Sequence, residues 1–191
     1  ADSVGRRTHR FRESSLRPAQ PLSASSNQFP GPSAPPSRDS PLAPPPLPDP
    51  TEWTVANIQR LEWKRFELLA SQFFSAVGFD ARMTRVGADG GVDVVLRKPG
   101  QEMPIGVAQC KAWNTYKVGV KPVRELFGVM SAEKVEHGVF VTTSTFTDEA
   151  RDFAQGKNLE LVDGESMVAF IRRLPPDRQQ VLFNTAFSGD Y

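Results

Sequence analysis

The alternation of apolar and polar side chains predicts strands between residues 79 and 111. Residues 79–84 alternate with the period of a half-buried strand. Two further runs rich in β-branched residues, 92–98 and 105–111, are separated by a Pro99-Gly100 turn signal. This combination predicts an antiparallel hairpin.

Helical periodicity precedes these strands. From about Ile58 apolar positions recur at steps of three and four, and Gly78 follows as a natural terminator. The apolar stripe consists of Trp63, Phe66, Ala70, Phe73 and Val77. We therefore expect a helix that packs on the sheet by this stripe. Glu67 lies at the rim of the stripe, where a solvated charge is the ordinary alternative to a functional group.

After residue 122 the pattern alternates between helix and strand. Pro122 suits the first turn of a helix. Its apolar face consists of Val123, Leu126, Phe127 and Met130. The later predicted elements are a buried strand at 138–143, a helix capped by Thr147 and ended by Gly156, a strand at 159–162, an Asp163-Gly164 turn, and a short helix at 165–173 stopped by Pro175-Pro176. This alternation implies parallel crossovers, so the expected fold is α/β, with a mixed β-sheet flanked by helices on both faces.

Composition divides the chain unevenly. Residues 1–50 carry 12 of the 17 prolines and few bulky apolar residues. Such a segment buries too little surface to offset its ordering entropy. We therefore predict a disordered tail or linker at 1–52, a catalytic domain at 53–175 and a C-terminal extension at 176–191. Six arginines against four acids in the tail allow loose DNA contact, although a plain spacer fits as well.

Charge and cysteine content exclude several classes of protein. Beyond residue 50 there are 17 basic and 18 acidic residues, so any nucleic-acid surface must be local. Cys110 alone supports neither an internal disulfide nor a cysteine-based zinc site. No apolar run is long enough to cross a bilayer, so a cytoplasmic setting is expected. The chain begins with Ala1 rather than Met, which leaves room for a longer protein with an N-terminal membrane anchor.

Three polar side chains converge in the predicted hairpin. Strand parity places Asp93 on one face of the first strand, and Gln109 with Lys111 on one face of the second. Asp93, the Gln109 amide oxygen and the Cys110 backbone carbonyl could supply three oxygen ligands to a magnesium ion. Lys111 would hold water or stabilise phosphoryl oxygens beside the ion. A solvated polar strand end is the alternative, and these residues alone do not exclude it.

Two loops border this candidate site. Gly87, Gly90 and Gly91 would give the backbone a flexible entry to Asp93, and we expect Asp89 to be a turn residue rather than a further ligand. The glycine spacing fits no phosphate-binding fingerprint.

On the other side, Tyr116, Lys117 and Lys121 follow the second strand. They suit phosphate and sugar contacts with DNA, although a solvent-facing loop is the alternative.

Other hydrolytic chemistries have little support in the chain. The two histidines are His9 in the tail and His137 before a strand, which does not serve histidine-dependent nucleases. Ser144 lacks the Gly-x-Ser-x-Gly context of a serine hydrolase.

The sequence resembles a known family in the same region. The runs GADGGVDVV and GVAQCKAW resemble the catalytic core of Mrr-type restriction endonucleases, a branch of the PD-(D/E)XK nuclease superfamily. Flanking matches are EWKRFELLASQFFSAVGF, VRELFGVM, GVFVTTSTFTDEARDFA and LELVDGESM, so the resemblance runs from about Leu61 to Ile171. Val92 stands where the superfamily usually has proline, and Gln109 where it usually has Asp or Glu. The Mrr branch commonly carries Gln there.

This resemblance implies a restriction-endonuclease-like fold and a metal-dependent DNA endonuclease. It implies that Glu67, on the first helix, lies near the metal, so Asp93, Gln109, Lys111 and Glu67 form the expected catalytic set. The expected cofactor is Mg²⁺, with Mn²⁺ as a substitute. The expected substrate is double-stranded DNA, cleaved on both strands by a homodimer.

A second function remains open on the same fold. A module that binds or senses DNA without cutting it would tolerate Gln109, which supplies one negative charge fewer than a carboxylate. The presence of Asp93, Lys111 and Glu67 favours the enzyme.

Overall fold

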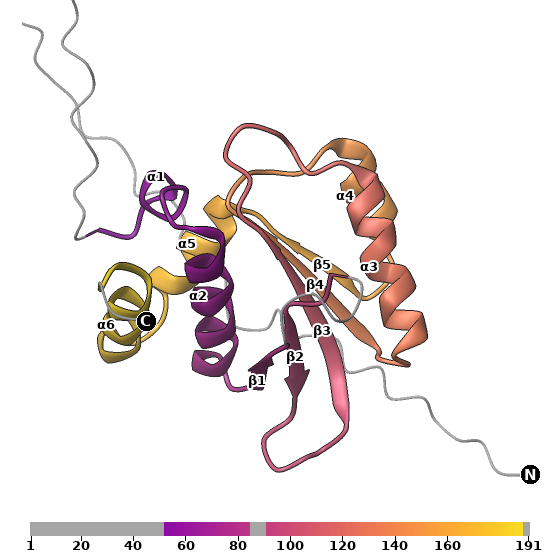
Figure 1. Ribbon diagram of the computed structural model, residues 1–191, viewed down its shortest axis with the longest axis horizontal. Coiled ribbons are helices and arrows are strands. Elements are labelled where there is room, and N and C mark those ends of the chain that lie inside the picture. Colours follow the sequence, from indigo (N-terminus) through magenta and orange to yellow (C-terminus); the bar gives the residue numbers. More distant parts are fainter. Residues whose placement is uncertain (1–51, 85–90, 189–191) are drawn as a thin grey trace, which may run out of the picture. The chain divides into compact units, whose positions relative to one another are not determined.

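A five-stranded mixed sheet forms the centre of the computed structural model (Figure 1). The structure describes residues 52–84 and 91–188. The strands, in spatial order, are β1 Asp80–Met83, β2 Val94–Arg97, β3 Pro104–Lys111, β4 His137–Thr142 and β5 Leu159–Val162. The helices are α1 Val55–Ile58, α2 Trp63–Ala76, α3 Val120–Ala132, α4 Asp148–Ala154, α5 Gly164–Arg172 and α6 Pro176–Phe187.

The sheet has an antiparallel half and a parallel half. β1, β2 and β3 pair antiparallel, with Val94 opposite Ala108. β4 pairs parallel with both β3 and β5, and α3 and α4 make the two crossovers. The predicted hairpin, the parallel crossovers and the mixed sheet are therefore confirmed.

Helices cover both faces of the sheet, as expected (Figure 1). α2, α5 and α6 lie on one side, and α3 and α4 lie on the other. Successive side chains of β4 point to opposite faces of the sheet. Val139 and Val141 pack in the hydrophobic cluster under α2, whereas Phe140 packs in the cluster under α3. This explains why β4 reads as a continuous apolar run rather than an alternating one.

The helix boundaries follow from local chemistry. Gly78 adopts φ +104° directly after α2, a conformation that suits glycine. The Thr147 hydroxyl accepts a hydrogen bond from the Ala150 N–H at 3.3 Å and caps α4. Asp163 accepts one from the Ser166 N–H at 3.0 Å and caps α5.

The buried stripe of α2 differs from the predicted one at its ends. Trp63 and Val77 are 49% and 44% exposed, because they lie in the first turn and just beyond the last turn of the helix. Leu69 and Phe74 are buried instead. The middle of the helix thus buries a broader stripe than the three-four pattern selected.

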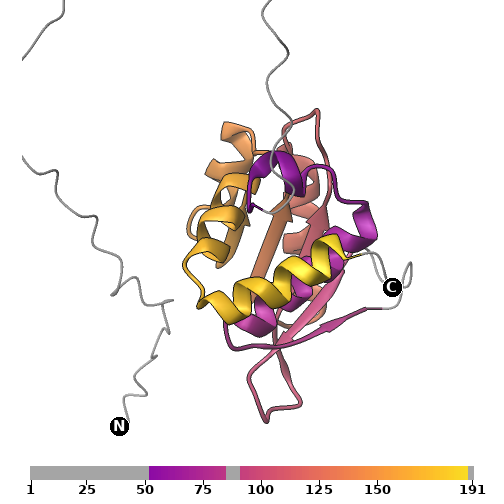
Figure 2. The ribbon, with the colours of Figure 1, turned by 90° about the vertical axis from the view of Figure 1, so that its left-hand side faces the viewer.

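The helix α6 was not predicted. Pro176 is its first residue, a position where proline needs no N–H partner. Figure 2 shows α6 running across the outer side of α2. Leu182 is 1% exposed, and the Phe183 and Phe187 rings lie 5.6 and 5.7 Å from Trp53.

The domain boundaries at residues 52 and 175 remain predictions. No helix within 52–84 and 91–188 combines the length and apolarity needed to span a bilayer.

Candidate active site

Asp93 lies directly before β2, where its backbone is fixed on both sides. Its N–H donates to the Ala108 carbonyl at 2.9 Å, and its carbonyl accepts from the Thr84 N–H at 3.0 Å. Its carboxylate accepts a hydrogen bond from the Cys110 N–H at 2.6 Å. The Asp93 side chain therefore points at the last residues of β3, next to Lys111.

Glu67 reaches the same carboxylate from α2. The side chains of Glu67 and Asp93 lie close enough for a hydrogen bond between them to affect the pKa of both, and such a bond forms when one of the two carboxyl groups holds a proton. Burial and the negative charge of Asp93 raise the pKa of Glu67 to about 7, although Lys111 and Lys64 act to lower it. Glu67 is thus the group that holds the shared proton near neutral pH.

The pKa of Asp93 is also raised above its ordinary value. Burial raises its pKa, while the Cys110 N–H, the Lys111 ammonium and the Glu67 hydrogen bond act to lower it. The pair therefore carries more negative charge than its surroundings neutralise when both groups are ionised.

Lys111 is the last residue of β3 and directly follows Cys110. Its charge acts on both Glu67 and Asp93. Its carbonyl accepts from the Thr142 hydroxyl at 2.8 Å and from the Thr143 N–H at 3.3 Å, so the strand end is fixed by β4. The structure therefore brings Glu67, Asp93 and Lys111 together from three elements, α2, the start of β2 and the end of β3.

Gln109 lies at the same end of the hairpin, opposite Asp93 in the antiparallel register. Its side chain is 5% exposed and packs against Gly91. A Cβ atom at Gly91, which has φ +99°, would come within 2.5 Å of the Gln109 amide nitrogen. The glycine is therefore needed for this approach. Within the described part of the chain, the Gln109 side chain forms no hydrogen bond with Glu67, Asp93 or Lys111. Its place among the metal ligands remains a prediction.

Cys110 is buried, with 3% exposure, in the cluster under α2. This confirms that its side chain is a small buried hydrophobe on the face opposite Gln109. Burial raises the pKa of its thiol well above the usual value, and the charges of Asp93 and Glu67 add to the shift. The thiol is therefore inert, and the residue contributes to the site through its backbone N–H, which sequence patterns cannot reveal.

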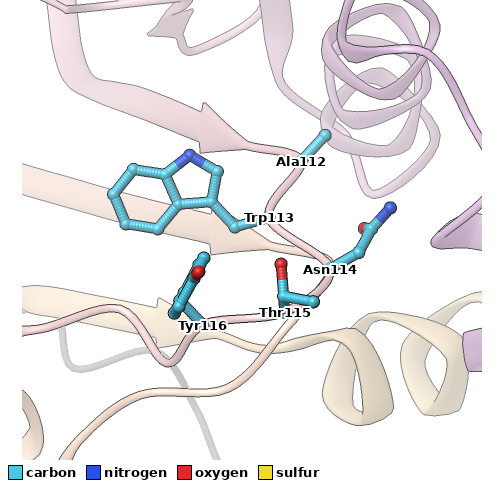
Figure 3. A pocket seen from close by; sticks show the side chains of 5 residues that line it. All are labelled: Ala112, Trp113, Asn114, Thr115 and Tyr116. Carbon is cyan, nitrogen blue, oxygen red and sulfur yellow. The ribbon is translucent and has the colours of Figure 1, made fainter.

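The loop after β3 is exposed. Tyr116 is 76% exposed, and Lys117 and Lys121 are exposed as well. An open hollow of about 610 Å³ is lined by Ala112, Trp113, Asn114, Thr115 and Tyr116 (Figure 3). Trp113 was not among the functional residues predicted from the sequence. The predicted roles of Gly87, Asp89 and Gly90 concern positions outside the described residues.

A divalent cation fits the donor set around Asp93. Within the described ranges, no three His, Cys, Asp or Glu side chains form a cluster that could hold a metal ion. The site described above offers two carboxyl groups, those of Glu67 and Asp93. Two carboxyl groups close enough to share a proton repel one another once ionised, and a cation would replace that proton. Hard cations also accept amide and carbonyl oxygens, which Gln109 and Cys110 could add.

Comparisons with known proteins point to one family. A family model of the Mrr catalytic domain, described as a restriction endonuclease, matches residues 58–171, more than half of the 191 residues. The type IV methyl-directed restriction enzyme EcoKMrr of Escherichia coli is 34% identical over 120 residues, which are 60% of this chain and 39% of that protein. An uncharacterized protein of Sinorhizobium fredii is 30% identical over 119 residues, which are 59% of this chain and 30% of that protein.

Two solved structures are also similar. The DNA modification-dependent restriction endonuclease AspBHI shows 25% sequence identity and a TM-score of 0.49, covering 63% of this chain and 34% of that chain. The MspJI restriction endonuclease, solved in complex with a 27-mer oligonucleotide, shows 22% identity and a TM-score of 0.46, covering 65% and 32%. The chain thus spans 30% to 39% of the length of each of these four proteins.

Proposed function

The chain belongs to the Mrr-type restriction endonuclease family, and from that premise we propose that it is a divalent-metal-dependent DNA endonuclease. The observation that carries the proposal is the convergence of Glu67, Asp93 and Lys111, whose charges act on one another, at the point where the Cys110 N–H holds the Asp93 carboxylate. Groups with pKa values perturbed by burial and by a specific charged neighbour are typical of catalytic centres. The proposed reaction is hydrolysis of phosphodiester bonds in double-stranded DNA.

We propose that Asp93, Glu67, the Gln109 amide oxygen and the Cys110 backbone carbonyl hold the cation. The proposed ion is Mg²⁺, with Mn²⁺ as a substitute, because oxygen ligands suit both. When bound, such an ion activates water and neutralises charge on the phosphoryl group.

The chain's own residues then have distinct tasks. The Cys110 N–H orients Asp93 by a charge-assisted hydrogen bond of 2.6 Å, so the carboxylate need not reorganise during the reaction. The Glu67 carboxyl, whose pKa is about 7 without metal, would give up its proton as the cation binds and then serve as an ionised ligand. The Lys111 ammonium, fixed at the end of β3, is the donor proposed to stabilise the phosphoryl oxygens.

Double-strand cleavage by this chain calls for two copies. One chain supplies one Glu67–Asp93 pair, and cutting both strands requires two hydrolytic events, so we propose a homodimer for double-strand breaks and nicking by the monomer. The similarity to a methyl-directed restriction enzyme supports a role in restricting DNA. We propose that the protein acts in the cytoplasm.

A second candidate function is a module on the same fold that binds DNA without cutting it. The observation that favours it is Gln109, which contributes no charge and whose amide nitrogen packs against Gly91. A weaker metal site would follow from that arrangement.

Plasmid cleavage separates the two functions. The full chain should nick or cut methylated or unmethylated plasmid with Mg²⁺ or Mn²⁺ and not with EDTA. Lys111→Ala should abolish cleavage, because the proposed phosphoryl donor is lost, whereas Lys98→Ala should retain it. Lys98 is an exposed cation at the hairpin turn, at the opposite end of β3. A parent chain that binds DNA but never cuts it with either ion would establish the non-cleaving module instead.

A further inference from the structure

Two aromatic rings stand exposed in the loop between β3 and α3. Trp113 is 39% exposed and Tyr116 is 76% exposed, and both line the hollow of about 610 Å³. Figure 3 shows the two rings on the same side of the loop, while the Asn114 side chain turns to the other side. Within the described part of the chain, neither ring pairs with another ring. Part of the Trp113 side chain and most of the Tyr116 side chain are therefore accessible to a ligand.

The loop is held firmly although its rings are exposed. The Asn114 amide donates to the Gln59 carbonyl at 2.5 Å, and the Gln59 amide donates to the Thr143 carbonyl at 3.1 Å. The Thr143 hydroxyl lies 3.1 Å from the Trp113 carbonyl and 3.0 Å from the Asn114 side-chain oxygen, and it donates to one of them at a time. The first half of the loop is thus tied to β4 and to the turn after α1.

The second half of the loop is anchored by Val118. Its side chain is fully buried, its N–H donates to the Thr145 carbonyl at 2.8 Å, and its carbonyl accepts from the Thr147 N–H at 3.0 Å. Both ends of the loop are fixed, so its backbone does not need to be ordered when a ligand arrives. Preorganisation of this kind favours binding because less conformational entropy is lost.

The segment that carries the rings is basic. From residue 103 to residue 124 the sequence contains no Asp or Glu and four basic residues. These are Lys111, Lys117, Lys121 and Arg124. Lys111 precedes Trp113 by two positions, and the exposed Lys117 directly follows Tyr116. Flat aromatic surfaces between cations suit a ligand that combines a planar ring with negative charge.

We propose that Trp113 and Tyr116 form a stacking platform for an unpaired nucleobase of the DNA strand that passes Lys111. This inference rests on the proposed function, because it places the platform next to the scissile phosphate. The volume of the hollow falls within the range of about 300–1,000 Å³ typical of small-molecule sites, which a single nucleotide fits. An intact duplex keeps its bases stacked on one another, so the platform acts on a base that is unpaired or turned out of the helix.

Base-dependent binding tests the platform. The full chain is titrated, in EDTA, into a labelled single-stranded 12-mer of deoxyadenosines and into an abasic 12-mer with the same phosphates, and fluorescence anisotropy is measured. The parent should bind the base-bearing strand about tenfold more tightly or better, the scale of one to a few stacked bases. Trp113→Ala and Tyr116→Ala should lose most of this preference, whereas Tyr116→Phe, which keeps the ring, should retain it.

A matched control and a second signal complete the test. Met103→Ala removes another exposed apolar side chain, 77% exposed in the hairpin turn at the opposite end of β3, and should leave the preference unchanged. Emission from 2-aminopurine placed in the strand should be quenched on binding to the parent and less so on binding to Trp113→Ala.

The outcomes separate this inference from the proposed function. Equal affinity of the parent for both strands, or an undiminished preference in both alanine variants, would overturn the platform and leave the nuclease proposal standing. No binding of the parent to either strand or to duplex DNA would contradict both.

Discussion

Two carboxylates at the same edge of the sheet have opposite electrostatic surroundings. Asp93 precedes β2 and Asp163 follows β5, and the strand directions place both at the edge where β3 ends. Burial raises the pKa of Asp93, and its neighbours do not fully compensate. Burial also acts to raise the pKa of Asp163, but hydrogen bonds from Ser166 and Arg151 outweigh it, so the pKa is lowered.

This difference separates a functional from a structural role. Asp163 caps α5 and pairs with Arg151 at 3.1 Å, so its charge is satisfied within the fold. Asp93 lies near a second carboxyl group, that of Glu67. A proton on Glu67 relieves the repulsion between the two groups. One carboxylate therefore stabilises the fold, while the other leaves negative charge that only a cation would neutralise fully.

The largest expected effect is on cleavage. Asp93→Asn removes a ligand charge that an amide does not replace, and cleavage should fall about 10²-fold or more, since several kcal/mol of charge stabilisation depend on the ion. Asp163→Asn should cleave like the parent. Binding of uncut DNA without metal should hold or rise slightly in Asp93→Asn, because a negative charge is lost beside the phosphate. Initial rates of cleavage of supercoiled plasmid measure the effect. Equal losses of cleavage in Asp93→Asn and Asp163→Asn would contradict the assignment of a functional role to Asp93 alone.

The reverse comparison concerns stability. Asp163→Ala should lower the free energy of unfolding by about 1–2 kcal/mol, because the cap of α5 and the ion pair with Arg151 are both lost. Asp163→Asn should cost less, since asparagine also caps helices. Asp93→Asn in the absence of metal should cost little or stabilise the protein, because it relieves repulsion with Glu67. Urea denaturation at pH 7.5 measures all three free energies of unfolding. A larger loss of stability in Asp93→Asn than in Asp163→Ala would mean that Asp93, and not Asp163, is the structural carboxylate.

The pH dependence of stability should also differ between the two sites. The pKa of Glu67 is raised from 4.5 to about 7 in the folded state, so the native protein binds more protons than the unfolded chain between these values. Metal-free stability from this group is therefore fully present below pH 4.5 and is lost as pH rises through 7. The pKa of Asp163 is lowered, so its contribution is lost only as pH falls through the acid range.

Denaturation of the parent and of Glu67→Gln between pH 5 and 8 checks this prediction. The difference in stability between the two should change across that window, because glutamine does not titrate. Asp163→Ala should run parallel to the parent there. A constant difference between the parent and Glu67→Gln would mean that Glu67 ionises normally.

Much of the fold could be predicted because its signals are local. The turn at Pro99-Gly100, the cap at Thr147 and the apolar run of β4 act over a few residues, and each is present in the structure. The helix α6 was missed because its stability depends on distant partners: Trp53 packs on Phe183 and Phe187, more than 100 residues away in sequence.

The candidate site divides in the same way. Strand parity predicted that Asp93 and Lys111 approach each other, because both lie on neighbouring strands. The hydrogen bond from the Cys110 N–H to Asp93 could not be predicted, since every residue but proline has the same backbone donor. Glu67 was indicated only by the family resemblance, because its proximity to Asp93 depends on how α2 packs on the sheet.

The smallest expected effect comes from the tail. The described contacts of both carboxylate sites lie beyond residue 52, so removing residues 1–50 should change neither. The melting temperature should shift by no more than about 2 °C, because the tail has few bulky apolar residues to bury. Differential scanning fluorimetry compares the two chains, and a large drop would show that the tail contributes to the core.

The central claim is that a cation replaces the proton shared by Glu67 and Asp93. Isothermal titration calorimetry with Mn²⁺ at pH 6, in two buffers of different ionisation enthalpy, counts the protons released per ion. We predict about one proton for the parent, since Glu67 is mostly protonated at that pH, and close to none for Glu67→Gln. Binding of Mn²⁺ to the parent without proton release, or the same release in Glu67→Gln, would contradict the claim.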